Sequence, residues 1–386
     1  MADNNKKILR RVNETITKLT NKDFTLYFFV IDSKNIPNGS TQYSYQIAKT
    51  LFDLGYKVKM VYQIENELSA KSIKKLEEEG KVVPEELVFT GVGDWLGEEY
   101  MKIPHLNIAT TEWRISPADF LFIPEAFSSL MKQTYQYKAP CKRIVLLHNF
   151  DYVTDFIPFN DEWITYGIND AVVNTESQSE LVKSVFPYVK TNILTPYIEE
   201  CFRKPVKQKK LAVNIVSKKT DDVNKVIKQF YWKYPMYRFI TFRDLRNYSK
   251  EKYAEYLKET PITIWIDDDT PFGYSALEAM RCGNIVVGKV PQRIPEWMGD
   301  EDGLFDNGVW TYNINSLPDI LAKVIGSWMR DEVPNVLYEN IEKLNNLYTK
   351  EQWNKNVNDM ITNYIEERIT EINFFKDSII EKTETE

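Results

Sequence analysis

Polar and charged side chains gather between two apolar runs, 262–266 and 285–287, where a strand would lead into a helix and then into a second strand. Gly273 would let the backbone approach a ligand closely. The amides that follow it would open a helix, and helix N-termini bind phosphate. Glu278, about one helical turn further on, could accept hydrogen bonds from ribose hydroxyls. The candidate binding residues of this segment are Asp269, Thr270, Phe272, Gly273, Tyr274, Ser275 and Glu278.

Hydroxyl and basic side chains follow two other apolar runs of strand length, 211–216 and 237–242. A lysine ammonium can hold a phosphate as a point charge, although most loop lysines are simply solvated. These residues extend the predicted phosphate site beyond the first segment. They are Ser217, Lys218, Lys219 and Arg243.

Two candidates come from the first half of the chain. His148 ends the apolar run 144–147, and Gly39 lies in the turn-rich loop after the run 24–31. Ligands of open α/β sheets bind beyond the carboxyl ends of the strands, so both residues should face a cleft. A lone histidine is more often structural, and the position at a strand end is what makes this one a candidate. His105 has no such context and is expected to be structural.

Short apolar runs alternate with helical patterns along the whole chain. This alternation predicts an α/β protein with two doubly wound, Rossmann-like domains. We expect the first domain at 1–200, the second at 201–345, and a final helix with a polar tail at 346–386. Residues 6–20 are expected to form a basic amphipathic helix that packs on the first domain, with a membrane-surface anchor as the alternative.

The bulk composition narrows the class of protein. The 386 residues exceed the roughly 250–300 at which a single core stops growing. A net charge of −7 argues against a dominant nucleic-acid footprint. Three scattered cysteines and two histidines favour neither a disulfide framework nor a zinc site, so we expect no metal. With no signal peptide and no apolar stretch near the roughly 20 residues that span a bilayer, we expect a cytoplasmic protein of a bacterium or a virus-infected host cell.

The order of residues in 272–287 carries a family resemblance. This segment resembles the C-domain signature of retaining, glycogen-synthase-like GT-B glycosyltransferases (group 1, family 4-like). The shared order is Phe-Gly, then Glu-Ala-Met, then Gly and a hydrophobic strand. The resemblance implies two Rossmann-like domains facing a cleft, with a C-terminal helix that crosses back to the first domain. It also implies sugar transfer with retention from a nucleotide-diphosphate sugar, UDP- or GDP-linked in the first instance, without a metal or other cofactor.

The resemblance assigns roles to individual positions. Glu278 would contact the ribose, and Gly39 would approach the donor phosphate from the first domain. His148 would lie close to the transferred sugar and Lys218 near the diphosphate, which makes these two the catalytic candidates. The family usually carries a glutamate where this chain has Thr270, so either a neighbouring aspartate makes that sugar contact or the contact is lost.

Several alternatives stay open. The aspartate run 267–269 could hold a divalent cation, although a solvated strand end is the simpler interpretation. The chain could be a phage-type glucosyltransferase acting on modified DNA bases, a non-catalytic relative with a binding or structural role, or, less in keeping with the motif, a sugar-nucleotide epimerase. The acceptor could be a glycan, a lipid-linked sugar, a protein or a modified base, and a homo-oligomer is one further option. The unassigned acceptor-side residues are Glu112, Trp113, Arg114 and Glu125.

Overall fold

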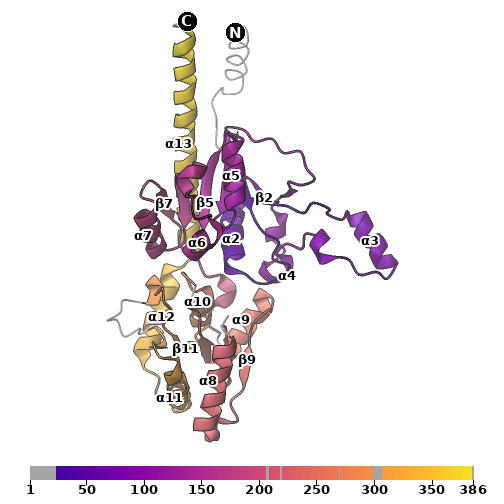
Figure 1. The fold of residues 1–386 in the computed structure, drawn as a ribbon. Coiled ribbons are helices and arrows are strands. Elements are labelled where there is room, and N and C mark those ends of the chain that lie inside the picture. Colours follow the sequence, from indigo (N-terminus) through magenta and orange to yellow (C-terminus); the bar gives the residue numbers. More distant parts are fainter. Residues whose placement is uncertain (1–22, 206–207, 218–219, 269, 299–306, 385–386) are drawn as a thin grey trace.

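Two α/β domains lie one above the other, and a long C-terminal helix runs along the upper domain and projects past it (Figure 1). The computed structural model describes side chains as far as residue 374. The helix expected at 6–20 and the candidates Lys218, Lys219 and Asp269 lie outside the described residues. The described ranges are 23–205, 208–217, 220–268, 270–298 and 307–384.

The first domain is built on a parallel sheet in which the described residues form seven strands, in the order β3-β2-β1-β4-β5-β6-β7. The strands are β1 (Thr25–Phe29), β2 (Lys57–Tyr62), β3 (His105–Asn107), β4 (Asp119–Pro124), β5 (Lys142–Leu147), β6 (Asp170–Val173) and β7 (Lys190–Ile193). The helices are α2 (Gly39–Asp53), α3 (Ala70–Glu78), α4 (Gly93–Leu96), α5 (Ser128–Gln136), α6 (Phe150–Phe156) and α7 (Glu176–Val185). Because every pairing is parallel, the carboxyl ends of the strands meet at one edge.

The second domain repeats the plan with a five-stranded parallel sheet in the described residues, in the order β12-β11-β10-β8-β9. The strands are β8 (Val213–Ile215), β9 (Phe242–Asp244), β10 (Ile262–Trp265), β11 (Ile285–Lys289) and β12 (Val309–Thr311). The helices are α8 (Thr220–Lys233), α9 (Lys250–Glu259), α10 (Tyr274–Arg281), α11 (Leu317–Met329) and α12 (Asn335–Leu347). Two parallel, doubly wound sheets confirm the predicted fold class.

The two faces of the first sheet are buried against different helices. Successive strand side chains point to opposite faces, so Leu26 and Phe28 of β1 join a core that includes residues of α2. Tyr27 and Phe29 join a second core with residues of α5, α6 and α7. This double burial explains why the strands are continuous apolar runs rather than alternating ones.

The final helix, α13 (Lys350–Glu384), packs on the first domain, as the resemblance implied. The indole Nε1 of Trp353 donates to Thr50 Oγ1 at 2.8 Å, and Asn192 Nδ2 donates to the Tyr364 hydroxyl at 2.6 Å. Both aromatic side chains are buried in the core beneath α2. The last helix therefore completes the hydrophobic core of the domain from which it is furthest in sequence.

The strand expected at 237–242 is wrong in its position. Residues Pro235–Tyr237 form a 3-10 turn, and β9 covers only Phe242–Asp244. The Tyr237 ring stacks on Phe230 of α8 with centroids 5.9 Å apart. Aromatic packing against that helix thus claims the first part of the apolar run, and the strand begins later than the sequence pattern indicated.

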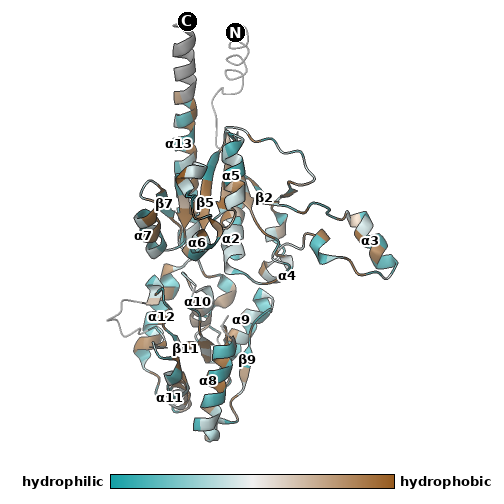
Figure 2. Ribbon diagram, in the orientation of Figure 1, coloured by the Kyte–Doolittle hydropathy of each residue, from teal (hydrophilic) through white to brown (hydrophobic). Residues whose placement is uncertain are grey.

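Brown apolar residues concentrate on the strands, while the exposed faces of the helices are largely teal (Figure 2). Within the part of the chain that the structure describes, no helix is both long enough and apolar enough to cross a membrane.

Candidate functional site

A cavity of about 330 Å³ lies between the two domains, at the carboxyl ends of both sheets. The first domain contributes the loop before α2, the start of α2 and the end of α4. The second contributes the ends of β8, β9 and β10 and the starts of α9 and α10. The predicted residues that line it are Gly39, Ser217, Thr270, Tyr274, Ser275 and Glu278.

The N-termini of α2 and α10 both open at this cavity. Asn38 caps α2, and its Oδ1 accepts from the amides of Ser40 and Thr41 at 2.9 and 3.2 Å. A side chain added to Gly39 would lie 3.6 Å from the Tyr274 ring, an ordinary contact. Within the protein itself, the position therefore has room for a small side chain.

Gly273 and Phe272 support α10 but do not belong to the cavity wall. Gly273 has a φ of +75° and precedes the first residue of α10, a backbone conformation that favours glycine. A Cβ there would lie 3.0 Å from the Trp297 ring and 3.3 Å from Trp265. The Phe272 carbonyl accepts from Trp297 Nε1 at 2.5 Å. The two tryptophans thus occupy the space that a side chain at position 273 would need.

Glu278 lines the cavity and is only 7% exposed. Burial, and next the Glu199 carboxylate, raise the pKa of Glu278 to about 8, while Lys250, Gln42 and Tyr253 oppose the shift. Within reach of a ligand hydroxyl, this carboxyl group could both donate and accept a hydrogen bond near neutral pH.

The loop residues after β8 and β10 hold one another in place. The Ser217 hydroxyl donates to the Ile266 carbonyl, and the Thr270 hydroxyl donates to Asp267 Oδ2. Asp268 forms an ion pair with Lys289, with 2.7 Å between Oδ1 and Nζ. Asp267 and Asp268 thus have partners within the protein, and Thr270 stands at the cavity wall where the family usually carries a glutamate.

Arg243 was predicted to contact the donor, but its side chain is engaged elsewhere. Its Nη1 donates to Glu259 Oε2 at 2.9 Å, and its guanidinium lies 4.3 Å from the Tyr256 ring centroid. Because β9 ends at Asp244, Arg243 is inside the strand and the residues at its carboxyl end come later. Arg246, held by Asp244 at 2.6 Å, is the arginine that lines the cavity.

A second cavity, of about 430 Å³, adjoins the first, and Asn38 contributes to the walls of both. His148 lies in this second cavity and is 6% exposed. Its Nδ1 is 2.8 Å from Glu125 Oε2, and its Nε2 is 3.0 Å from Ser44 Oγ. Glu125 also accepts from the amides of His148 and Asn149 at 3.1 and 2.9 Å.

Sequence reasoning left Glu125 unassigned although a signal was present. Glu125 follows β4 directly, His148 follows β5 directly, and these two strands are neighbours in the sheet. Side chains after adjacent parallel strands meet at the same edge. An acid–histidine pair could therefore have been predicted from the two strand ends together.

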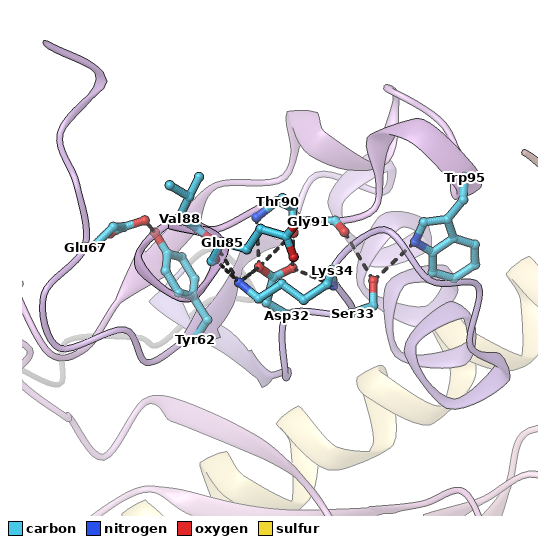
Figure 3. A network of polar contacts seen from close by, with 10 residues as sticks. All are labelled: Asp32, Ser33, Lys34, Tyr62, Glu67, Glu85, Val88, Thr90, Gly91 and Trp95. Carbon is cyan, nitrogen blue, oxygen red and sulfur yellow. Dashed lines mark hydrogen bonds and ion pairs between the residues drawn. The ribbon is translucent and has the colours of Figure 1, made fainter. Parts of the chain in front are cut away.

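A polar network fixes the loop between β1 and α2, which lines both cavities (Figure 3). Asp32 accepts from the Thr90 amide at 2.8 Å and from the Gly91 amide at 3.0 Å, and Lys34 Nζ donates to the Val88 carbonyl at 2.9 Å. Burial alone would raise the pKa of Asp32, but the hydrogen bonds from Thr90, Lys34 and Gly91 outweigh it and leave the pKa below its usual value. The loop is thus tied to the segment that leads into α4.

Comparison with known proteins extends this description. No protein-family model and no curated protein matches the sequence. The pneumococcal O-GlcNAc transferase GtfA, solved with UDP and GlcNAc, matches with a TM-score of 0.58 at 9% identity, over 90% of this chain and 99% of its own. Sucrose-phosphate synthase from Thermosynechococcus elongatus matches with a TM-score of 0.58 at 11% identity, over 89% of this chain and 99% of its own. TarM matches with a TM-score of 0.57 at 11% identity, over 91% of this chain and 100% of its own.

The chain has the GT-B fold. The architecture implied by the 272–287 segment is confirmed at this level, and the identities of 9–11% carry the likeness no further than the fold. In this GT-B protein one cavity lies between the two domains, and the described residues that line the other all belong to the first domain.

Proposed function

We propose that this protein transfers a sugar from a nucleotide-diphosphate sugar, UDP-linked in the first instance, to an acceptor hydroxyl. The observation that carries the proposal is that α2 and α10, from different domains, open at one cavity beside the buried carboxyl group of Glu278. The N-terminus of α10 favours an anion, and the start of α2 closes the cavity from the first domain. The structure of GtfA with UDP supports the choice of base.

The donor diphosphate is proposed to lie against the amides at the start of α10, where Tyr274 and Ser275 line the cavity. Lys218 and Lys219 follow Ser217, which lines the same cavity. We therefore propose that their ammonium groups neutralise the negative charge of the diphosphate. Glu278 takes the ribose hydroxyls. Preorganised amide hydrogen-bond donors and ammonium groups stabilise the negative charge that develops on a leaving diphosphate.

During transfer, the anomeric carbon of the donor sugar is proposed to lie next to the second cavity. The acceptor oxygen bonds to that carbon, the bond from carbon to the diphosphate breaks with its electron pair going to the diphosphate, and the proton of the acceptor hydroxyl passes to the departing diphosphate. His148, held by Glu125 through Nδ1, is proposed to orient the sugar or the acceptor through Nε2. Retention of configuration and independence of metal are parts of the proposal that come from the family resemblance.

Calorimetric titration with UDP, GDP, TDP and ADP, each with Mg²⁺ and with EDTA, tests the proposal. We expect UDP to bind most tightly, with the same affinity under both conditions. Release of UDP from UDP-glucose and UDP-GlcNAc is then followed in the presence of acceptors. Failure of every nucleotide to bind the folded protein would refute the donor site and favour a non-catalytic role.

A further inference from the structure

The cavity beside His148 combines an apolar wall with a polar one. The apolar wall contains large side chains that remain well exposed, namely Ile31 at 66%, Ile36 at 58%, Phe156 at 50% and Tyr152 at 41%. The two aromatic rings belong to α6 and lie with their centroids 6.3 Å apart, edge to face. Exposed apolar side chains gathered around one cavity are typical of a binding surface.

The polar wall is made of hydroxyl groups on the first turns of α2. Ser40, Thr41 and Ser44 line the cavity, and Ser44 contacts the His148 ring. The amides of Ser40 and Thr41 are already taken by the Asn38 side chain. This helix end therefore offers neutral hydroxyl partners to a ligand here, rather than the free amides that would attract an anion.

The charge in the cavity is unsuited to a phosphorylated ligand. Among the described residues that line it there is no lysine and no arginine. Glu125 is the one acidic lining residue in that set, and it is already held by two backbone amides and by His148. Recognition of phosphate relies on arginine, lysine or free amides, and binding to DNA relies on neutralising several phosphates.

We infer that this cavity takes an uncharged acceptor in which the reacting hydroxyl neighbours an apolar group, as in an alkyl or aryl glycoside. The apolar group lies against Phe156 and Ile36, and the hydroxyl faces Ser44 and His148. The inference rests on the proposed function and narrows its acceptor. It sets aside phosphorylated sugars and modified DNA bases.

Titration of the UDP-loaded protein with matched glucosides tests the inference. The probes are phenyl β-D-glucoside, octyl β-D-glucoside below its micelle concentration, glucose and glucose 6-phosphate. We expect both glucosides to bind, and glucose 6-phosphate to bind at least about tenfold more weakly, since an anion would enter a cavity without a cation. Equal or tighter binding of glucose 6-phosphate overturns the inference.

Two substitutions on neighbouring aromatic residues separate a specific contact from surface stickiness. Phe156→Ala removes a lining ring and should weaken phenyl glucoside binding by about five- to tenfold, the range of one aromatic contact. Phe159→Ala, three positions further on and fully exposed outside the cavity, should leave that affinity unchanged. Thermal melts confirm that both variants are folded, and equal affinities for the two variants overturn the inference.

Failure of the donor site is distinguishable from failure of the acceptor inference. The described residues that line the cavity beside His148 all come from the first domain, so the free protein can be titrated with the same glucosides. If no nucleotide binds, the proposed function fails, whatever the glucosides do. If UDP binds and neither glucoside does, the acceptor inference fails alone.

Discussion

The two cavities of this protein are neighbours built on different plans. The cavity between the domains takes its walls from both domains, while the cavity beside His148 is lined, as far as the structure describes the chain, by first-domain residues. Polar contacts join the two domains beside the first cavity: the Tyr274 hydroxyl donates to Gln46 Oε1 at 3.1 Å, and Lys250 pairs with Glu199 at 2.7 Å. The shape of the cavity between the domains, the proposed donor cavity, therefore depends on how the two domains are arranged. The shape of the cavity beside His148, the proposed acceptor cavity, does not.

The cavities also differ in charge. Arg246, Lys250 and Glu278 line the donor cavity, which suits a ligand with phosphates and ribose hydroxyls. The cavity beside His148 offers hydroxyls and apolar groups. A change in one cavity should thus alter one kinetic constant and spare the other, and this separation can be tested residue by residue.

The largest expected effect is on turnover. His148→Ala should lower sugar transfer by about 100-fold, the cost of holding a reactant slightly out of place, while UDP affinity stays unchanged because His148 does not line the donor cavity. The matched control is His105→Ala. That histidine pairs with the Tyr45 hydroxyl at 2.9 Å and lines neither cavity, so its loss should affect stability alone. Full turnover of the His148 variant would make it structural.

A somewhat smaller effect is expected on donor binding. Glu278→Ala should weaken UDP binding by about 10- to 100-fold, the range for hydrogen bonds to a carboxyl group. Glu255→Ala is the control, since that exposed carboxylate pairs with Lys252 on the surface of α9. Calorimetry compares the two variants. Unchanged UDP affinity in the Glu278 variant would remove the residue from the donor site.

The burial of Glu278 also makes stability depend on pH. Its pKa is raised to about 8 in the folded protein, so folding favours the protonated form. The stabilising contribution is fully present below the unfolded pKa and is lost as the pH rises through the folded pKa. The melting temperature should therefore fall less between pH 5 and 8.5 in the Glu278→Gln variant than in the unmodified protein. The corresponding difference in unfolding free energy is at most about 1.4 kcal/mol per pH unit. Parallel curves for the two proteins would contradict the shift.

The sequence predicts this fold well where apolar runs are buried on both faces. The strands before Gly39, His148 and Ser217 were placed correctly because a central parallel strand leaves no alternative for such a run. The run 237–242 misled because it belongs to an edge of the second sheet, where stacking of Tyr237 on Phe230 competes with strand pairing. Neighbouring contacts, rather than the pattern itself, decide at such an edge.

The candidate site divides in a similar way. Residues directly after a central strand or at the start of a helix, such as Glu278 and Tyr274, line a cavity. The roles of Gly273 and Phe272 could not be predicted, because Trp297, which fills the space against them, comes from a distant loop. The partnership of His148 with Glu125 needed the order of the strands as well as their ends.

The smallest expected effect tests the register of β9. Arg246→Ala should weaken UDP binding by about threefold, because an exposed arginine paired with Asp244 adds only a screened contact. Arg243→Ala is the matched control. Its guanidinium is held by Glu259 and Tyr256 outside the cavity, so UDP affinity should not change. Calorimetry at low salt gives the clearest difference in UDP affinity between the two variants. A larger loss of affinity from Arg243→Ala than from Arg246→Ala would mean that β9 ends at residue 242, as the sequence pattern indicated. Arg243, and not Arg246, would then be the arginine that lines the donor cavity.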